Sequence, residues 1–145
     1  ILKRRAVSLS IRADNERFRT DLGFRDPVAG ALRTNGERAG YLQFGPEIPA
    51  ERGLYRARWI GTVDAAPGDG PLGYVEIWFG ARRIAREPCS MGPRRDDHLL
   101  ASLDFTVPDE GVTKLDYRFF ASAGTRMLLE RVELFSGTAI PAATP

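Results

Sequence analysis

The stretch Gly73-Tyr74-Val75-Glu76-Ile77-Trp78-Phe79-Gly80 decides the fold class of this sequence. Its side chains alternate in character, and a period of two is what a β-strand imposes on its two faces. Three apolar side chains share the face that we expect to be buried: Val75, Ile77 and Phe79. Two aromatic side chains and a carboxylate share the outer face: Tyr74, Glu76 and Trp78. The stretch therefore predicts a half-buried strand with an aromatic outer surface.

A second clear strand is predicted upstream, over residues 54–63. Its inward members are Tyr55, Ala57 and Trp59, and the arginines between them are Arg56 and Arg58. Proline and glycine in residues 65–72 exclude regular structure there, so this segment connects the two strands. We expect Arg56 and Arg58 to line the outer face of the same sheet as Tyr74 and Trp78.

Shorter strand-like segments fill the rest of the chain. They span residues 6–11, 29–34, 40–46, 83–87, 99–107, 115–119 and 128–135. Turn signals such as Asn35-Gly36 and Pro108-Asp109-Glu110-Gly111 separate them, while residues 15–27 and 88–97 are predicted to be mainly loop. No window keeps the apolar period of a helix, and the sequence has 15 glycines and 10 prolines. This pattern predicts an all-β, two-sheet antiparallel β-sandwich.

Length and composition fit one ordinary folded domain: 145 residues, 43% hydrophobic and 28% charged. We place the domain at residues 1–137 and a tail or linker at 138–145. Because the chain begins with Ile1 rather than Met, we expect it to be a piece of a longer protein. No apolar run approaches the roughly 18 residues of a membrane-spanning helix, and no signal peptide is recognisable, so we expect no membrane insertion.

The single cysteine, Cys89, excludes an internal disulfide and favours a reducing compartment, so the expected location is the cytoplasm. The net charge is +2, and only Lys3 and Lys114 of the 21 basic residues are lysines. Acidic residues are interleaved with the arginines almost everywhere. A nucleic-acid partner is therefore not expected, because no continuous basic stripe is available to follow a phosphate backbone.

Two motifs carry a resemblance to a known group of domains. Residues 40–46, Gly-Tyr-Leu-Gln-Phe-Gly-Pro, and 53–59, Gly-Leu-Tyr-Arg-Ala-Arg-Trp, resemble jelly-roll carbohydrate-binding-type domains that accompany bacterial glycosyltransferases and other polysaccharide-biosynthesis proteins. The similarity continues in residues 103–108, 115–118 and 128–134. It implies a jelly-roll, galactose-binding-like sandwich that recognises a glycan or positions a catalytic partner domain, without catalysis of its own.

Strand geometry supplies the candidate carbohydrate site. Sugars stack on flat aromatic surfaces beside polar groups that satisfy their hydroxyls. Tyr74 and Trp78 lie about 13 Å apart on an extended strand, a little more than two sugar rings. The groups expected to bond hydroxyls or acidic groups are Glu76, Arg56 and Arg58. The alternative is that both aromatic rings lie buried beneath the irregular N-terminal segment.

Other chemistry is weakly indicated. Asp96, Asp97 and His98 are consecutive, and consecutive side chains rarely converge on one ion, so we interpret them as a solvated loop. His98 is the only histidine, which excludes a multi-histidine metal centre, and no Gly-x-Ser-x-Gly nucleophile motif accompanies it. We expect neither a catalytic residue nor a metal ligand here.

A structural calcium ion is the one cofactor left open, because jelly-roll binding modules often hold one where the first and last strands meet. Its candidate ligands are Glu130 with Asp14 or Glu16, although they form no defined calcium loop. Glu130 also interrupts the apolar alternation of residues 128–135, and we expect it to face solvent, a bulge or an ion.

The sequence thus predicts a non-enzymatic carbohydrate-binding or targeting module of a larger bacterial polysaccharide-processing protein. The alternative is a structural interaction or oligomerisation domain that packs on a catalytic partner through the same aromatic face. A hydrolase or lyase on a sandwich scaffold would need clustered carboxylates, which the sequence alone does not demonstrate.

Overall fold

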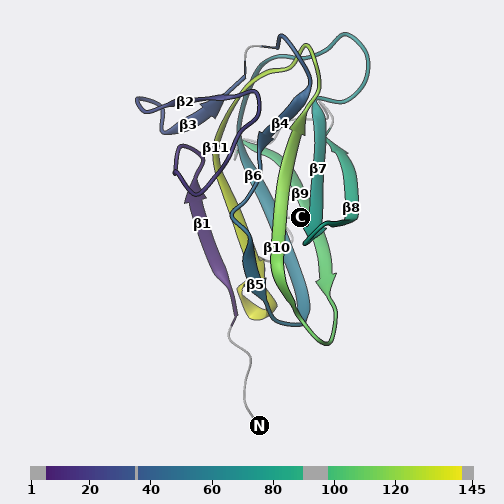
Figure 1. Cartoon of the computed structure of the whole chain (residues 1–145). Coiled ribbons are helices and arrows are strands. Elements are labelled where there is room, and N and C mark those ends of the chain that lie inside the picture. The colour runs from purple at the N-terminus through teal and green to yellow at the C-terminus, as the bar shows by residue number, and fades with distance from the viewer. Residues whose placement is uncertain (1–5, 35, 90–97, 142–145) are drawn as a thin grey trace.

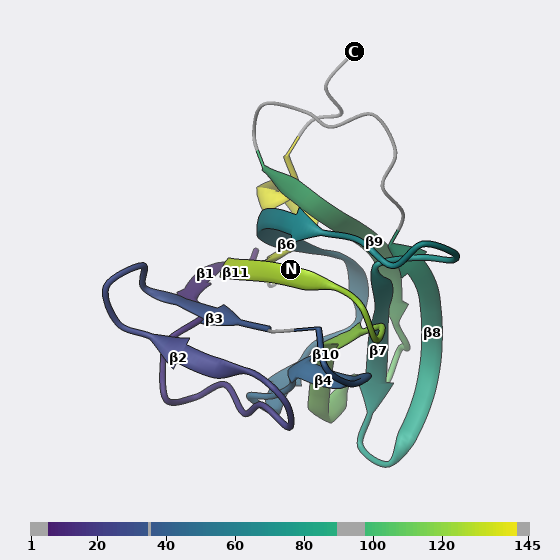
Figure 2. The same ribbon diagram turned by 90° about the horizontal axis from the view of Figure 1, so that it is seen from above.

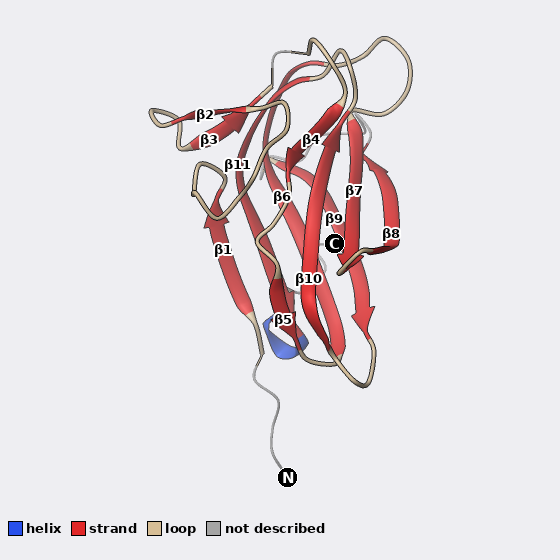
Figure 3. Ribbon diagram, in the orientation of Figure 1, coloured by secondary structure: helices blue, strands red, loops and turns tan. Residues whose placement is uncertain are grey.

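Two antiparallel β-sheets pack face to face in the computed structural model, which describes residues 6–34, 36–89 and 98–141 (Figure 1). Strands run through most of this part of the chain, and a short 3-10 turn, η1 (Gly137–Ala139), follows the last one (Figure 3). The predicted all-β antiparallel sandwich is therefore confirmed. Among the described residues, no helix is long and apolar enough to cross a membrane.

The first sheet is built around the long strand near the C-terminus. Its strands are β1 (Ser8–Arg12), β2 (Phe24–Asp26), β3 (Ala31–Arg33), β6 (Gly53–Ala65), β9 (Leu99–Val107) and β11 (Arg126–Ser136). They follow the order β2-β3-β11-β6-β9, and β1 also pairs with β11. Seen from above, β2 and β3 extend from the sandwich on the side away from β8 (Figure 2).

The second sheet holds the remaining strands: β4 (Gly40–Gln43), β5 (Ile48–Ala50), β7 (Gly73–Phe79), β8 (Arg82–Cys89) and β10 (Val112–Ala121). Their order is β4-β10-β7-β8, and β5 also pairs with β10. The chain changes sheet after β3, β5, β6, β8, β9 and β10. Such repeated crossing between two antiparallel sheets is expected of a jelly-roll type of sandwich.

Two details of the strand prediction were wrong. The strand β5 was missed because it is three residues long and contains a proline, a residue that favours loops and sheet edges. Pro88 and Cys89 were assigned to a loop, but they end β8, whose residues are mostly exposed and so lack the apolar alternation of a buried strand. Residues 90–97 of that predicted loop, and Asn35 of the predicted turn, lie outside the described residues.

A buried amide connects the two sheets. Trp59 on β6 is fully buried, and its Nε1 donates to Oε1 of Gln43 on β4 at 2.8 Å. The Nε2 atom of Gln43 donates to the carbonyl oxygens of Tyr117 at 2.7 Å and Gly45 at 3.1 Å. Because every polar atom of this amide is bonded, its burial between the sheets is compensated. The link fixes where β4 lies over the core.

Glu130 occupies one of the environments that we expected for it. The register of β11 against β6 shifts between Leu129 and Arg131, so Glu130 lies in a bulge. Its carbonyl oxygen accepts a hydrogen bond from the backbone amide of Ala13 at 2.8 Å. The bulge thus accommodates Glu130 without ending the strand.

Gly73 allows β7 and β10 to approach closely. An added Cβ at this position would lie 2.0 Å from the carbonyl oxygen of Phe120, which is a backbone atom and cannot rotate away. Gly68, in the loop between β6 and β7, would meet nothing within 4 Å. The two glycines therefore form a matched pair for testing backbone packing.

We expect Gly73→Ala to lower the free energy of unfolding by about 1–3 kcal/mol, the usual cost of overpacking, because β7 and β10 must separate. Gly68→Ala is the control and should change it by less than about 0.5 kcal/mol. Urea unfolding followed by circular dichroism measures both. Equal stability of the two variants would contradict the close approach.

Candidate functional site

The outer face of the second sheet gathers aromatic and charged side chains from four strands. Pairing of β10, β7 and β8 places Arg118 beside Glu76 and Glu76 beside Arg86, in one row across the sheet. We call the whole set the aromatic face: Tyr41, Tyr74, Glu76, Trp78, Arg83, Arg86, Asp116, Arg118 and Phe120. The predicted outward orientation of Tyr74, Glu76 and Trp78 is confirmed, since Val75 and Ile77 on the same strand are buried in the core.

Glu76 lies at the centre of this face and is only 1% exposed. Its Oε1 atom accepts hydrogen bonds from the hydroxyl of Tyr41 at 2.7 Å and from Nε1 of Trp78 at 2.8 Å. Its Oε2 atom lies 3.5 Å from Nη1 of Arg83 and 3.4 Å from Nε of Arg86. The carboxylate is therefore occupied by protein groups, and it positions its neighbours instead of presenting itself to a ligand.

Arginine side chains lie over the two aromatic rings that the sequence singled out. Cζ of Arg86 is 3.8 Å from the centroid of the Tyr74 ring, and Cζ of Arg118 is 4.3 Å from the centroid of the Trp78 ring. Both rings are half-buried. Cation–π contacts at these distances hold the rings and the guanidinium groups together. The surface is a mixed layer of aromatic rings and cations.

Sequence reasoning missed Tyr41 as a member of the site. Its ring makes an edge-to-face contact with Phe120 at 5.3 Å, while Phe120 makes a tilted contact with Tyr74 at 6.4 Å. Burial and the hydrogen bond to Glu76 raise the pKa of the Tyr41 hydroxyl, so it remains a proton donor to that carboxylate at neutral pH. Outward alternation of Tyr41 with buried Leu42 is a weak signal that could have indicated its position.

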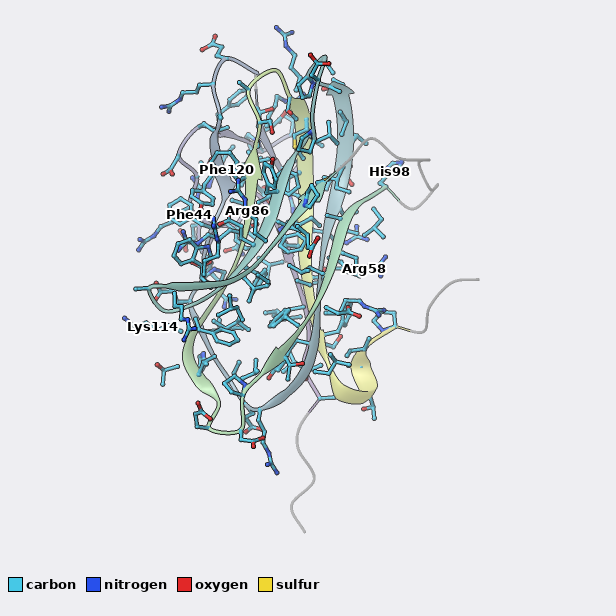
Figure 4. All side chains as sticks on the ribbon, turned by 90° about the vertical axis from the view of Figure 1, so that its right-hand side faces the viewer. Phe44, Arg58, Arg86, His98, Lys114 and Phe120 are labelled. Carbon is cyan, nitrogen blue, oxygen red and sulfur yellow. The ribbon has the colours of Figure 1, made fainter. Side chains whose placement is uncertain are left out.

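A polar pocket of about 470 Å³ adjoins the aromatic face. The charged side chains that line it are Arg17, Arg19, Glu47, Asp116 and Arg118. Phe44 also lines it and makes an edge-to-face contact with Tyr41 at 6.2 Å between centroids. In Figure 4, Phe44, Arg86 and Phe120 lie close together on one side of the molecule. The pocket and the aromatic face thus form one continuous surface.

The expectation that Arg56 and Arg58 share this surface was wrong. Both belong to β6 in the first sheet, and Figure 4 shows Arg58 on the opposite side of the molecule from Arg86. Arg56 bonds Asp104 through Nε at 2.6 Å and Nη2 at 3.0 Å, and Arg58 lies 3.8 Å from Glu133. Alternation assigns a side chain to a face of its strand, but it does not identify the sheet that the strand joins.

The remaining candidates lie away from the aromatic face or outside the described residues. His98 is exposed, has a positive φ of 59°, and lies on the side opposite Phe44 (Figure 4). Asp96 and Asp97 fall outside the described residues. The thiol of Cys89 is buried and lies 3.0 Å from the carbonyl oxygen of Leu100.

Calcium binding by Glu130 with Asp14 or Glu16 stays a prediction, and the structure gives the surroundings of two of these residues. Asp14 accepts a hydrogen bond from Arg12 at 3.1 Å, and Glu130 lies in the β11 bulge. Over residues 6–34, 36–89 and 98–141, no group of three or more His, Cys, Asp or Glu side chains is placed to hold a metal ion.

No protein-family model matches the sequence, and no curated protein matches it. Among solved structures, a family two carbohydrate esterase from Cellvibrio japonicus is similar in shape, with a TM-score of 0.48 and 8% sequence identity. The similarity covers 97% of this chain and 37% of the esterase chain, so the chain spans little more than a third of that protein's length.

We expect Glu76→Gln to lower the free energy of unfolding by about 1.5–3 kcal/mol, because two hydrogen bonds lose a charged acceptor and two arginines lose their counter-ion. The control is Asp109→Asn, which neutralises a carboxylate that is 94% exposed and should have an effect below about 0.5 kcal/mol. Urea unfolding followed by tryptophan fluorescence measures both. A Glu76→Gln protein as stable as the control would show that the carboxylate does not organise the face.

Because of the Arg56–Asp104 ion pair, we expect the free energy of unfolding to depend on pH in the acidic range. Hydrogen bonds from Arg56 lower the pKa of Asp104 in the folded state, whereas an unfolded aspartate titrates near about 3.9. The stabilisation is thus present above that pH and is lost as the pH falls through the folded pKa. Asp104→Asn should therefore be less stable than the natural chain at pH 6, with a difference that shrinks towards pH 2 in urea unfolding. A pH-independent difference would contradict this linkage.

Proposed function

We propose that this domain is a non-catalytic glycan-binding module of a larger polysaccharide-processing protein, and that the aromatic face is its binding surface. The observation that supports this most is the pre-ordered pair of Tyr74 and Trp78 on one outer strand face. The Trp78 indole is held by its bond to Glu76 and by Arg118, and the Tyr74 ring by Arg86. Rings fixed in advance lose little conformational entropy when a sugar packs against them.

The polar groups of the site differ from those expected from the sequence. Glu76 acts as a positioning residue. The arginines beside the aromatic rings are Arg83 and Arg86 of the neighbouring strand β8, and not Arg56 and Arg58 as expected. The side chains of Arg83 and Arg86 are 43% and 36% exposed, so they have donors available to sugar hydroxyls beside the rings. A sugar on this face would thus meet partly exposed aromatic rings and guanidinium donors together.

The assignment as a binding module agrees with the position of the only histidine. His98 lies on the side of the molecule opposite Phe44 and Phe120 (Figure 4), so it is not available as an acid or base beside a glycan on this face. The association with a polysaccharide-biosynthesis protein rests on the resemblance of residues 36–135 to accessory jelly-roll domains.

We expect Trp78→Ala to weaken glycan binding by about tenfold, or ~1.4 kcal/mol, because it removes both a ring that contacts the sugar and the surface on which Arg118 rests. A glycan array followed by calorimetry on the bound sugar measures the loss, and circular dichroism checks folding. Phe24→Ala is the matched control, since Phe24 is 49% exposed on β2 of the other sheet.

Two outcomes would contradict the proposal. The folded natural chain could bind no glycan, in which case contact of the aromatic face with another domain becomes the better explanation. Alternatively, Trp78→Ala and Phe24→Ala could bind equally well, which would place the glycan elsewhere.

A further inference from the structure

We infer that the pocket beside the aromatic face binds the carboxylate of an acidic sugar, so that the preferred ligand is a glycan containing uronic acid residues. This inference rests on the proposed glycan-binding function and specifies its ligand class. It depends on the charges that line the pocket and on the side chains that the pocket shares with the aromatic face.

Two arginines of the pocket lining have no carboxylate partner among the residues that the structure describes. Arg17 and Arg19 are exposed, and no carboxylate among the described residues is bonded to either guanidinium group. An arginine fork matches the two oxygens of a carboxylate and binds them with two parallel hydrogen bonds. These two side chains therefore provide the means of recognising an anion.

The acidic lining residues do not cancel this capacity. Asp116 is 3% exposed, and its oxygens accept hydrogen bonds from the amide of Gly45 and from Nε of Arg118, both at 2.8 Å. Glu47 is exposed and lies 4.0 Å from Nζ of Lys114, on the pocket rim. Three arginines and two carboxylates leave one net positive charge in the lining. A singly charged carboxylate matches that charge better than a doubly charged phosphate.

The size and position of the pocket fit one unit of a longer glycan. A volume of about 470 Å³ lies within the roughly 300–1,000 Å³ of small-molecule sites. Arg118 lines the pocket and also lies over Trp78, and Phe44 lines it and contacts Tyr41. A sugar chain that rests on Trp78 would therefore place a neighbouring residue in the pocket, where its carboxylate meets Arg17 and Arg19.

The test compares oligomers of galacturonic and glucuronic acid with their carboxyl-reduced, neutral counterparts by calorimetry at 150 mM salt. The natural chain should bind an acidic oligomer at least tenfold more tightly than its neutral counterpart. The double variant Arg17→Gln/Arg19→Gln should lose that preference and keep its affinity for the neutral oligomer. Arg126→Gln, an exposed arginine on β11 of the other sheet, is the control and should behave as the natural chain.

The outcomes separate this inference from the function on which it rests. Equal binding of acidic and neutral oligomers, unchanged in the double variant, would overturn the acidic-sugar inference and leave glycan binding supported. Competition by inorganic phosphate at the same concentration as the uronate would also overturn it, because the pocket would then bind any anion. Failure of the folded natural chain to bind any of these oligomers would overturn the acidic-sugar inference, whereas failure to bind any sugar on the glycan array would overturn both.

Discussion

The aromatic face depends on one buried carboxylate. Glu76 is 1% exposed at the middle of β7, and a charge removed from water is tolerated only when donors and opposite charges surround it. One of its oxygens takes two neutral donors, from Tyr41 and Trp78, and the other faces Arg83 and Arg86. Satisfying this single group therefore fixes side chains from β4, β7 and β8 in one arrangement.

The same arrangement distributes charge across the aromatic face. Surfaces used for stable protein contacts have an apolar centre depleted of charge, whereas this face has a row of alternating charges, Arg118, Glu76 and Arg86, between its aromatic rings. Both arginines also lie over aromatic rings. Under the proposed function, these ordered donors among the aromatic rings would meet the hydroxyl groups of a glycan.

The sequence predicted the strands better than it predicted their partners. Alternation in residues 73–80 correctly placed Tyr74 and Trp78 outside and Val75 inside, because that property is local to one strand. Pairing is not local, so the first-sheet position of β6, and with it Arg56, could not be read from its own residues. The role of Glu76 as a buried anchor was equally inaccessible, since it depends on side chains from two other strands.

The segment from Gly40 to Pro46 shows how the core and the site are coupled. Gln43 faces inward and is fixed by Trp59 across the sandwich, while Tyr41 and Phe44 are half-buried towards the aromatic face and the pocket. The short strand β4 therefore carries both the residue that bonds Trp59 in the core and the residue that bonds Glu76 on the aromatic face. A motif that at first indicates only how a jelly roll is built thus positions residues of the candidate site. A register shift between β4 and β10 pairs Gln43 with inward Phe119 and Tyr41 with outward Phe120, so side chains two residues apart face opposite ways.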